Sequence, residues 1–157
     1  MSDTYQDGVR LLARRSLTRH EVVQKLRALG HGDDEVEDAV SRLTAMSAID
    51  DAALARRFIE ERSATRGRGH ERVLAELRAR GVDPLVAASA WSQAVSEGAI
   101  DGGAVLARAV RSRLGPAPAR AGQARLARVY NALLHEGFEP KEVEEALAPY
   151  GFERIDA

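Results

Sequence analysis

The chain has no cysteine, so disulfide bonds and thiolate metal sites are excluded. Aromatic residues are only 4% of the 157 residues, so any core must be aliphatic and modest in size. No apolar run approaches the roughly 20 residues that span a membrane. The first residues carry an acid rather than a basic start followed by an apolar segment. We therefore expect no secretory signal, no membrane partner and a cytoplasmic protein.

Strand signals are missing as well, because no alternating β-branched run occurs and no Asn-Gly or Asp-Gly turn joins such runs. Lysine is scarce, with two lysines against 21 arginines. Arginine is the better residue for bidentate contacts with phosphates and carboxylates. The net charge of −1 nevertheless argues against a protein whose whole surface attracts polyanions.

One motif occurs three times along the chain. A leucine precedes a glycine by four residues, a valine precedes it by eight, and an apolar residue preceded by alanine follows it by ten. The glycines are Gly30, Gly81 and Gly137, spaced by 51 and 56 residues. A period of this length indicates a tandem array whose units bury their apolar faces against each other.

Apolar spacing within each unit predicts three short helices, the second of which ends at the glycine. The fold class is therefore all-α: an elongated tandem array of three three-helix, helix-turn-helix-like repeats with nine helices. We expect the repeats to span residues 1–48, 49–98 and 99–157. In the middle repeat we expect Phe58, Leu77 and Trp91 to be core residues.

Several helix starts are visible in the sequence. Thr18 and Glu21 have the spacing of a capping box, and the helix before them is expected to bury Val9, Leu12 and Ala13. The acidic pairs Asp33-Asp34 and Asp50-Asp51 fit helix capping better than a magnesium site.

The junction of the first two repeats carries an ordered series that resembles the RecX family, the small regulators of the RecA recombinase. The resemblance covers nearly the whole chain, and it departs at Ser47, where the family often has glycine. The series comprises Leu43, Ile49-Asp50-Asp51, Leu54-Ala55, Phe58-Ile59, Arg62, Gly67, Gly69, Val73, Leu77 and Gly81.

The resemblance implies a function without catalysis. RecX proteins bind RecA and its nucleoprotein filament, and they inhibit filament growth, strand exchange and coprotease activity. They also bind DNA weakly and with little sequence preference. We accordingly expect a monomeric regulator with RecA and non-specific DNA as partners, no cofactor and no metal. Filament capping, groove insertion and active disassembly all fit this expectation.

Two groups of arginines are the candidate partner and DNA contacts. The first surrounds the glycine turn of the middle repeat, where interleaved glutamates also fit a solvated face, and an open helix N-terminus near Gly69 would suit a phosphate. Of these arginines, we expect Arg62, Arg66, Arg68 and Arg72 to be exposed. The second group has no acid between Asp101 and Glu136 and forms the largest uncompensated positive charge. The candidates are Arg57, Arg62, Arg66, Arg68, Arg72, Arg108, Arg111, Arg113, Arg120, Arg125 and Arg128.

The sequence offers no catalytic set of nucleophile, base and orienting group. The histidines His20, His31, His70 and His135 lack metal-ligand spacing, and we expect them at the surface. A helix-turn-helix transcription regulator is the alternative function, and a plain helical scaffold is a third. The acidic third helices, with Asp33 to Asp38 and Glu142 to Glu145, argue against insertion into a major groove.

Overall fold

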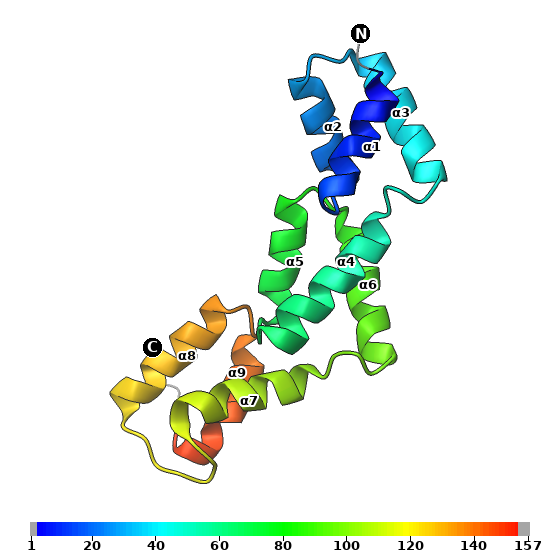
Figure 1. The fold of residues 1–157 in the computed structure, drawn as a ribbon. Helices are drawn as coiled ribbons and strands as arrows, with labels where there is room; N and C mark the ends of the chain where they lie inside the picture. Colours follow the sequence, from blue (N-terminus) through cyan, green and yellow to red (C-terminus); the bar gives the residue numbers. More distant parts are fainter. Residues whose placement is uncertain (1–2, 154–157) are drawn as a thin grey trace. The chain divides into compact units, whose positions relative to one another are not determined.

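The computed structural model describes residues 3–153, which contain nine α-helices and no strand (Figure 1). The predicted all-α class and the number of helices are confirmed. None of the helices in this range is long and apolar enough to cross a membrane. The helices are α1 Thr4–Arg14, α2 Arg19–Ala28, α3 Asp33–Ala45, α4 Asp51–Ile59, α5 His70–Ala79, α6 Pro84–Ser96, α7 Gly102–Leu114, α8 Gln123–His135 and α9 Pro140–Leu147.

Two further helical segments were not predicted from the sequence. A π-helix, η1, occupies Glu60–Thr65 and continues α4 without a break. A short 3₁₀-helix, η2, occupies Ala148–Tyr150 after α9. π-Helices are rare overall, but those that occur often lie at functional sites.

The chain divides into two compact units. The N-terminal unit comprises residues 1–58 and 76–91, and the C-terminal unit comprises residues 59–75 and 92–157. The predicted repeat boundaries at residues 48 and 98 stay a prediction. Each unit contains an aliphatic core: Leu17, Val22, Leu26, Val36, Ala39, Val40, Leu43 and Ile49 in the first, and Val105, Leu106, Val110, Leu126, Val129, Leu133, Phe138, Val143, Leu147 and Tyr150 in the second.

The repeated glycine ends a helix by the same turn each time. Gly30, Gly81 and Gly137 have φ of 91°, 86° and 95°, which is the left-handed region where only glycine is unstrained. Each glycine N–H donates to the carbonyl three residues before it, and the next N–H donates to the carbonyl of the motif leucine. These two bonds define a Schellman motif. The repeated Leu-Gly spacing is therefore the local signature of this turn.

In the N-terminal unit, the turn at the end of α5 packs against the start of α2; we name this the first junction. The Thr18 hydroxyl, fully buried, donates to the Arg80 carbonyl at 2.6 Å while also capping α2. A side chain at Gly81 would overlap His20. The Asp51 carboxylate accepts the Arg19 N–H at 2.9 Å, so the acid pair does cap helices, although Asp51 caps a helix other than its own.

In the C-terminal unit, the turn at the end of α8 packs against the start of α5; we name this the second junction. The Gly69 N–H donates to the Glu136 carbonyl at 2.8 Å, and the Glu71 N–H donates to the Gly137 carbonyl at 3.1 Å. The carbonyl end of one helix thus satisfies the free amides of the next. Since the dipoles of the two helices meet with opposite partial charges, this contact is also electrostatically favourable.

Two of the α1 residues expected in the core are exposed, and two residues in the middle repeat are only half-buried. On α1, Val9 and Ala13 are exposed, and the side facing α3 is formed by Thr4, Asp7 and Gly8. Because Gly8 has no side chain, α1 lies close to Leu43 of α3.

In the middle repeat, Leu77 is fully buried as predicted, whereas Phe58 and Trp91 are only half-buried. The Arg80 guanidinium lies 5.9 Å from the centre of the Phe58 ring, and this contact accounts for one partly open aromatic face.

Two glycines with the same backbone conformation allow the junction contact to be tested separately from the turn. We expect Gly30→Ala to lower the free energy of unfolding by about 1–2 kcal/mol, the strain of a left-handed alanine. Gly137→Ala is expected to cost a further 1–3 kcal/mol or so, because its Cβ would overlap the backbone of Arg72, whereas nothing lies within 4 Å at Gly30. Urea denaturation measures both; equal losses would mean that the second junction is loosely packed.

Ser47 has a left-handed backbone conformation, which strains a residue with a side chain but not a glycine. Its φ is 57°, and the corresponding turn at the end of α6 has Gly98 at φ 73°. We expect Ser47→Gly to raise the free energy of unfolding by about 0.5–1 kcal/mol, since relief of left-handed strain outweighs the entropy of a glycine. Ser41→Gly, an exposed position inside α3, is the control and should lower it by a similar amount. A Ser47→Gly variant no more stable than wild type would contradict the assignment of strain.

Candidate functional site

The arginines chosen from the sequence concentrate in one of the two units. Ten of the eleven belong to the C-terminal unit, and the exception is Arg57, whose Nη2 donates to the Ser16 hydroxyl at 3.2 Å in the N-terminal unit. The ten are Arg62, Arg66, Arg68, Arg72, Arg108, Arg111, Arg113, Arg120, Arg125 and Arg128.

The arginines of α7, of α8 and of the segment that connects them differ in how they are held. Arg111, Arg120 and Arg128 are exposed, and their side chains have no hydrogen-bond or ion-pair partner within residues 3–153. Arg108 and Arg125 are also exposed, but each donates through Nη2 to a backbone carbonyl, of Ala64 at 2.7 Å and of Arg113 at 2.6 Å. These contacts hold the two side chains in place while the rest of each guanidinium stays accessible.

The middle-repeat arginines are less exposed than expected. Arg66 is exposed and pairs with Glu61 at 3.2 Å, but Arg62, Arg68 and Arg72 are half-buried. The expectation of four largely exposed arginines at this turn is therefore wrong for three of them. The turn forms part of the second junction, because the Gly69 N–H donates to the Glu136 carbonyl. Helix periodicity does not reveal this long-range contact.

Two further expectations about this region are wrong. The open helix N-terminus near Gly69 is not open, because the amides of Gly69 and Glu71 already donate to carbonyls of the second junction. The positive charge of α7 is not wholly uncompensated either. The Glu136 carboxylate forms an ion pair with Arg113 and lies 3.8 Å from the Arg68 guanidinium.

A hollow lies beside these groups in the C-terminal unit. It is lined by the end of η1, by one face of α7 and by Glu136. Three guanidinium groups, those of Arg66, Arg108 and Arg113, border it together with the Ser112 side chain. The arrangement suits an anion, since planar guanidinium groups bind phosphate and carboxylate oxygens in pairs.

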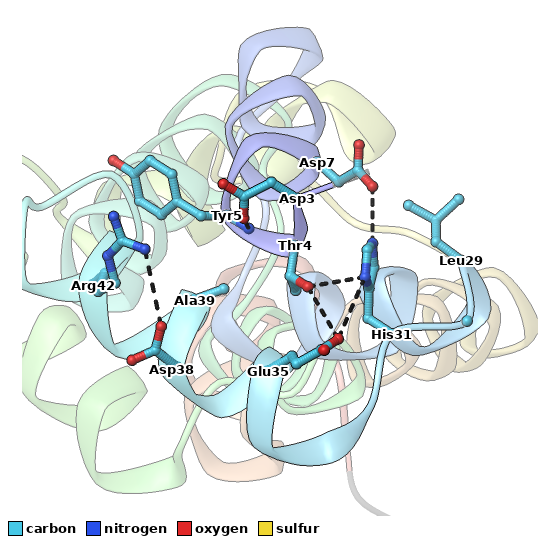
Figure 2. Close-up of a pocket in the computed structure, with 11 residues that line it drawn as sticks. Asp3, Thr4, Tyr5, Asp7, Leu29, His31, Glu35, Asp38, Ala39 and Arg42 are labelled. Carbon is cyan, nitrogen blue, oxygen red and sulfur yellow. Dashed lines mark hydrogen bonds and ion pairs between the residues drawn. The ribbon is translucent and has the colours of Figure 1, made fainter. Parts of the chain in front are cut away.

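A second hollow, in the N-terminal unit, brings together groups that the sequence analysis kept apart (Figure 2). His31 is expected at the surface, yet its side chain is only 10% exposed. Its Nε2 lies 2.8 Å from the Asp7 carboxylate, and its Nδ1 lies 2.9 Å from the Thr4 hydroxyl. His31 follows the glycine of the motif, where the other repeats have the buried apolar residues Val82 and Phe138. The burial of His31 could have been predicted by comparing the residue after the glycine in all three repeats, which is apolar in the other two.

The hydroxyl–imidazole–carboxylate order resembles a nucleophile relay, but the surroundings do not suit one. An acyl-transfer site needs donors for a developing oxyanion. The Thr4 hydroxyl instead lies 3.5 Å from the Glu35 carboxylate, and Asp3 and Asp38 line the same hollow. The cluster therefore acts as a polar contact between α1 and α3. No group of side chains within residues 3–153 has an arrangement that could hold a metal ion.

At the first junction, Glu21 is the acid that completes the predicted capping box, which the structure confirms. Burial by itself raises the pKa of the Glu21 carboxyl. Hydrogen bonds from Arg80 at 2.8 Å and from the Thr18 N–H at 2.9 Å, with the charges of Arg80 and Arg15, outweigh burial and lower the pKa below its ordinary value. Glu21 thus joins the cap of α2 to the end of α5.

The fold and these surfaces define a class: tandem three-helix domains joined by packed helix ends, with an arginine-rich surface and no metal cluster within residues 3–153. Family models agree with this description. The model of the first three-helix domain of RecX matches residues 5–43, and that of the second three-helix domain matches residues 50–90. The chain belongs to the RecX family of regulatory proteins.

Relatives named "Regulatory protein RecX" align with much of the chain. That of Halorhodospira halophila is 34% identical, covering 94% of this chain and 88% of its own length; that of Amycolatopsis mediterranei is 32% identical, covering 91% and 82%. The Chromohalobacter salexigens relative is 39% identical over a shorter stretch, 54% of this chain and 55% of its own length, so this match spans about half of that relative.

Solved structures share the fold. The crystal structure of RecX from Lactobacillus salivarius superimposes with a TM-score of 0.75 at 21% identity, covering 92% of each chain. A second RecX crystal structure gives a TM-score of 0.73 at 21% identity, covering 92% of this chain and 70% of the other. At this identity the structural likeness establishes the fold alone.

The lowered pKa of Glu21 predicts how stability changes with pH. A carboxyl whose pKa is lower in the folded state stabilises the protein above the pKa it has when unfolded. We expect the stability advantage of wild type over Glu21→Gln to be constant at neutral pH and to shrink as the pH falls below about 4.5. Chemical denaturation across this pH range measures it. Glu37→Gln, an exposed position on α3, controls for the loss of one negative charge; a pH-independent advantage would contradict the prediction.

Proposed function

We propose that this protein inhibits RecA by binding its nucleoprotein filament, limiting filament growth, strand exchange and coprotease activity without catalysing a reaction. The observation that carries the proposal is membership of the RecX family over most of the chain. The exposed side chains of Arg111, Arg120 and Arg128 in the C-terminal unit supply contacts to phosphates or acidic side chains of such a filament.

DNA binding by the isolated protein is proposed to be weak, independent of sequence and sensitive to salt. Arg111, Arg120 and Arg128 support this, because exposed guanidinium groups without intramolecular partners in residues 3–153 are available to displace counterions from phosphates. The alternative function, a transcription regulator, needs a helix that enters the major groove. Five carboxylates of α3 are exposed at its start, where DNA phosphates would repel them: Asp33, Asp34, Glu35, Glu37 and Asp38.

Inhibition of DNA-dependent ATP hydrolysis by the cognate RecA tests the proposal. We expect inhibition well below one protein per RecA subunit. The double charge reversal Arg111→Glu with Arg128→Glu should raise the concentration for half-inhibition about tenfold and weaken binding to unrelated oligonucleotides. Stability should change by no more than about 0.5 kcal/mol per site, as is usual for exposed positions.

The matched control reverses two arginines of the N-terminal unit, Arg14→Glu with Arg78→Glu, which are also exposed and without partners in residues 3–153. It should inhibit like wild type. Unchanged RecA activity at equal stoichiometry would refute the proposal. Tight binding to one DNA sequence would instead favour the transcription regulator.

A further inference from the structure

We propose that the hollow between η1 and α7 binds one phosphate group of the DNA backbone. In the free protein the Glu136 carboxylate occupies Arg113, which lines the hollow, and the neighbouring Arg68. The inference rests on the proposed function and adds a specific site to it. The hollow lies wholly within the C-terminal unit, among residues drawn from three segments that are distant in sequence.

The donors around Glu136 are those that a phosphate prefers. Arg113 reaches its Oε1 from α7, and Arg68 approaches the same oxygen at 3.8 Å from the turn after η1. Their side chains are 30% and 32% exposed, so both guanidinium groups are partly shielded from water. Arg113 contacts Glu136 through Nη2, while its Nη1 donates to the Ala109 carbonyl at 3.0 Å and fixes the guanidinium. A carboxylate and a phosphate compete for such a pair of arginines, because both offer anionic oxygens to charged N–H donors.

Glu136 occupies a position that does not favour an acid. It is the C-terminal cap of α8, where the helix dipole places partial negative charge. The same position before the motif glycine is Leu29 in the first repeat and Arg80 in the second. The helix end therefore gains nothing from this carboxylate, and its neighbouring arginines compensate it. An acid placed against local electrostatics in this way is expected where function rather than stability selects the residue.

The rest of the hollow supplies further contacts. The Arg108 guanidinium is fixed by its bond to the Ala64 carbonyl in η1, so its remaining N–H groups are oriented in advance. Arg66 borders the hollow just after η1, with 55% of its side chain exposed and an ion pair to Glu61 at 3.2 Å. Ser112 lines the α7 side, where its hydroxyl donates to the Ala109 carbonyl at 2.9 Å. When a phosphate enters, the Glu136 side chain, 18% exposed, turns toward solvent and leaves Arg113 and Arg68 to the ligand. Internal competition of this kind lowers affinity for DNA.

The test compares two variants that each remove one negative charge. Glu136→Gln releases the two arginines, whereas Glu139→Gln changes an exposed residue whose side chain makes no capping bond. With a labelled oligo-dT probe in fluorescence anisotropy, we expect Glu136→Gln to bind about three- to tenfold more tightly than wild type. Its salt dependence should be steeper by about 0.7, the value for one extra phosphate contact on a single strand. Glu139→Gln should change the affinity less than twofold or so.

A second variant tests whether Arg113 binds phosphate or only forms a structural ion pair with Glu136. Arg113→Lys keeps the positive charge beside Glu136 but loses the planar pair of donors. It should weaken oligo-dT binding several-fold and, when combined with Glu136→Gln, abolish the gain. Equal affinities of Glu136→Gln and Glu139→Gln, or an Arg113→Lys variant that binds like wild type, would overturn the proposal.

Titration with inorganic phosphate, followed by amide NMR signals, tests the site without DNA or RecA. Signals of Ser112 and Arg113 should shift at lower phosphate concentration in Glu136→Gln than in wild type. Shifts confined to other residues would overturn the phosphate site even if the protein inhibits RecA. Conversely, shifts at Ser112 and Arg113 in a protein that fails to inhibit RecA would refute the proposed function and leave the site standing.

Discussion

The structure depends on one contact made twice: a helix that ends in a glycine turn places its last carbonyls against the first polar groups of another helix. The buried Thr18 hydroxyl meets the Arg80 carbonyl in one unit, and the Gly69 amide meets the Glu136 carbonyl in the other. Three-helix repeats of about 50 residues have small aliphatic cores, so polar contacts between helix ends add to the packing within each unit. The requirement is steric as well as polar, since a methyl group at Gly81, Gly69 or Gly137 would overlap the facing backbone or Cβ atoms.

The local parts of this design could be predicted from the sequence. The nine helices, the capping box at Thr18 and the left-handed glycines follow from short-range rules that one repeat suffices to express. The partners could not be predicted, because they are far apart in the chain. Glu136 lies 68 residues from Arg68, and His31 lies 24 residues from Asp7. Burial of Arg62, Arg68 and Arg72 has the same origin, since helix periodicity shows which residues share a face but not what covers it. The π-helix η1 had no sequence signal that we recognise.

The two hollows place different chemistry beside the same backbone turn. In the first repeat, the residue after the glycine is His31, and a polar cluster replaces an apolar contact. In the third repeat, the residue before the glycine is Glu136, which gathers two arginines. The turn itself is formed by backbone bonds, so its flanking side chains are free to change while the fold is kept.

The reversal of charge between the two junctions has a consequence for assembly. Beside the first junction an arginine, Arg80, ends the helix and an acid, Glu21, receives it; beside the second an acid, Glu136, ends the helix and an arginine, Arg68, receives it. Were the end of α8 to dock on the start of α2, Glu136 would face Glu21, and like charges would meet. Tandem repeats are prone to exchange equivalent elements between copies during folding. The alternating charges penalise that exchange, so each helix end is directed to its own neighbour even though the backbone contacts alone do not distinguish them.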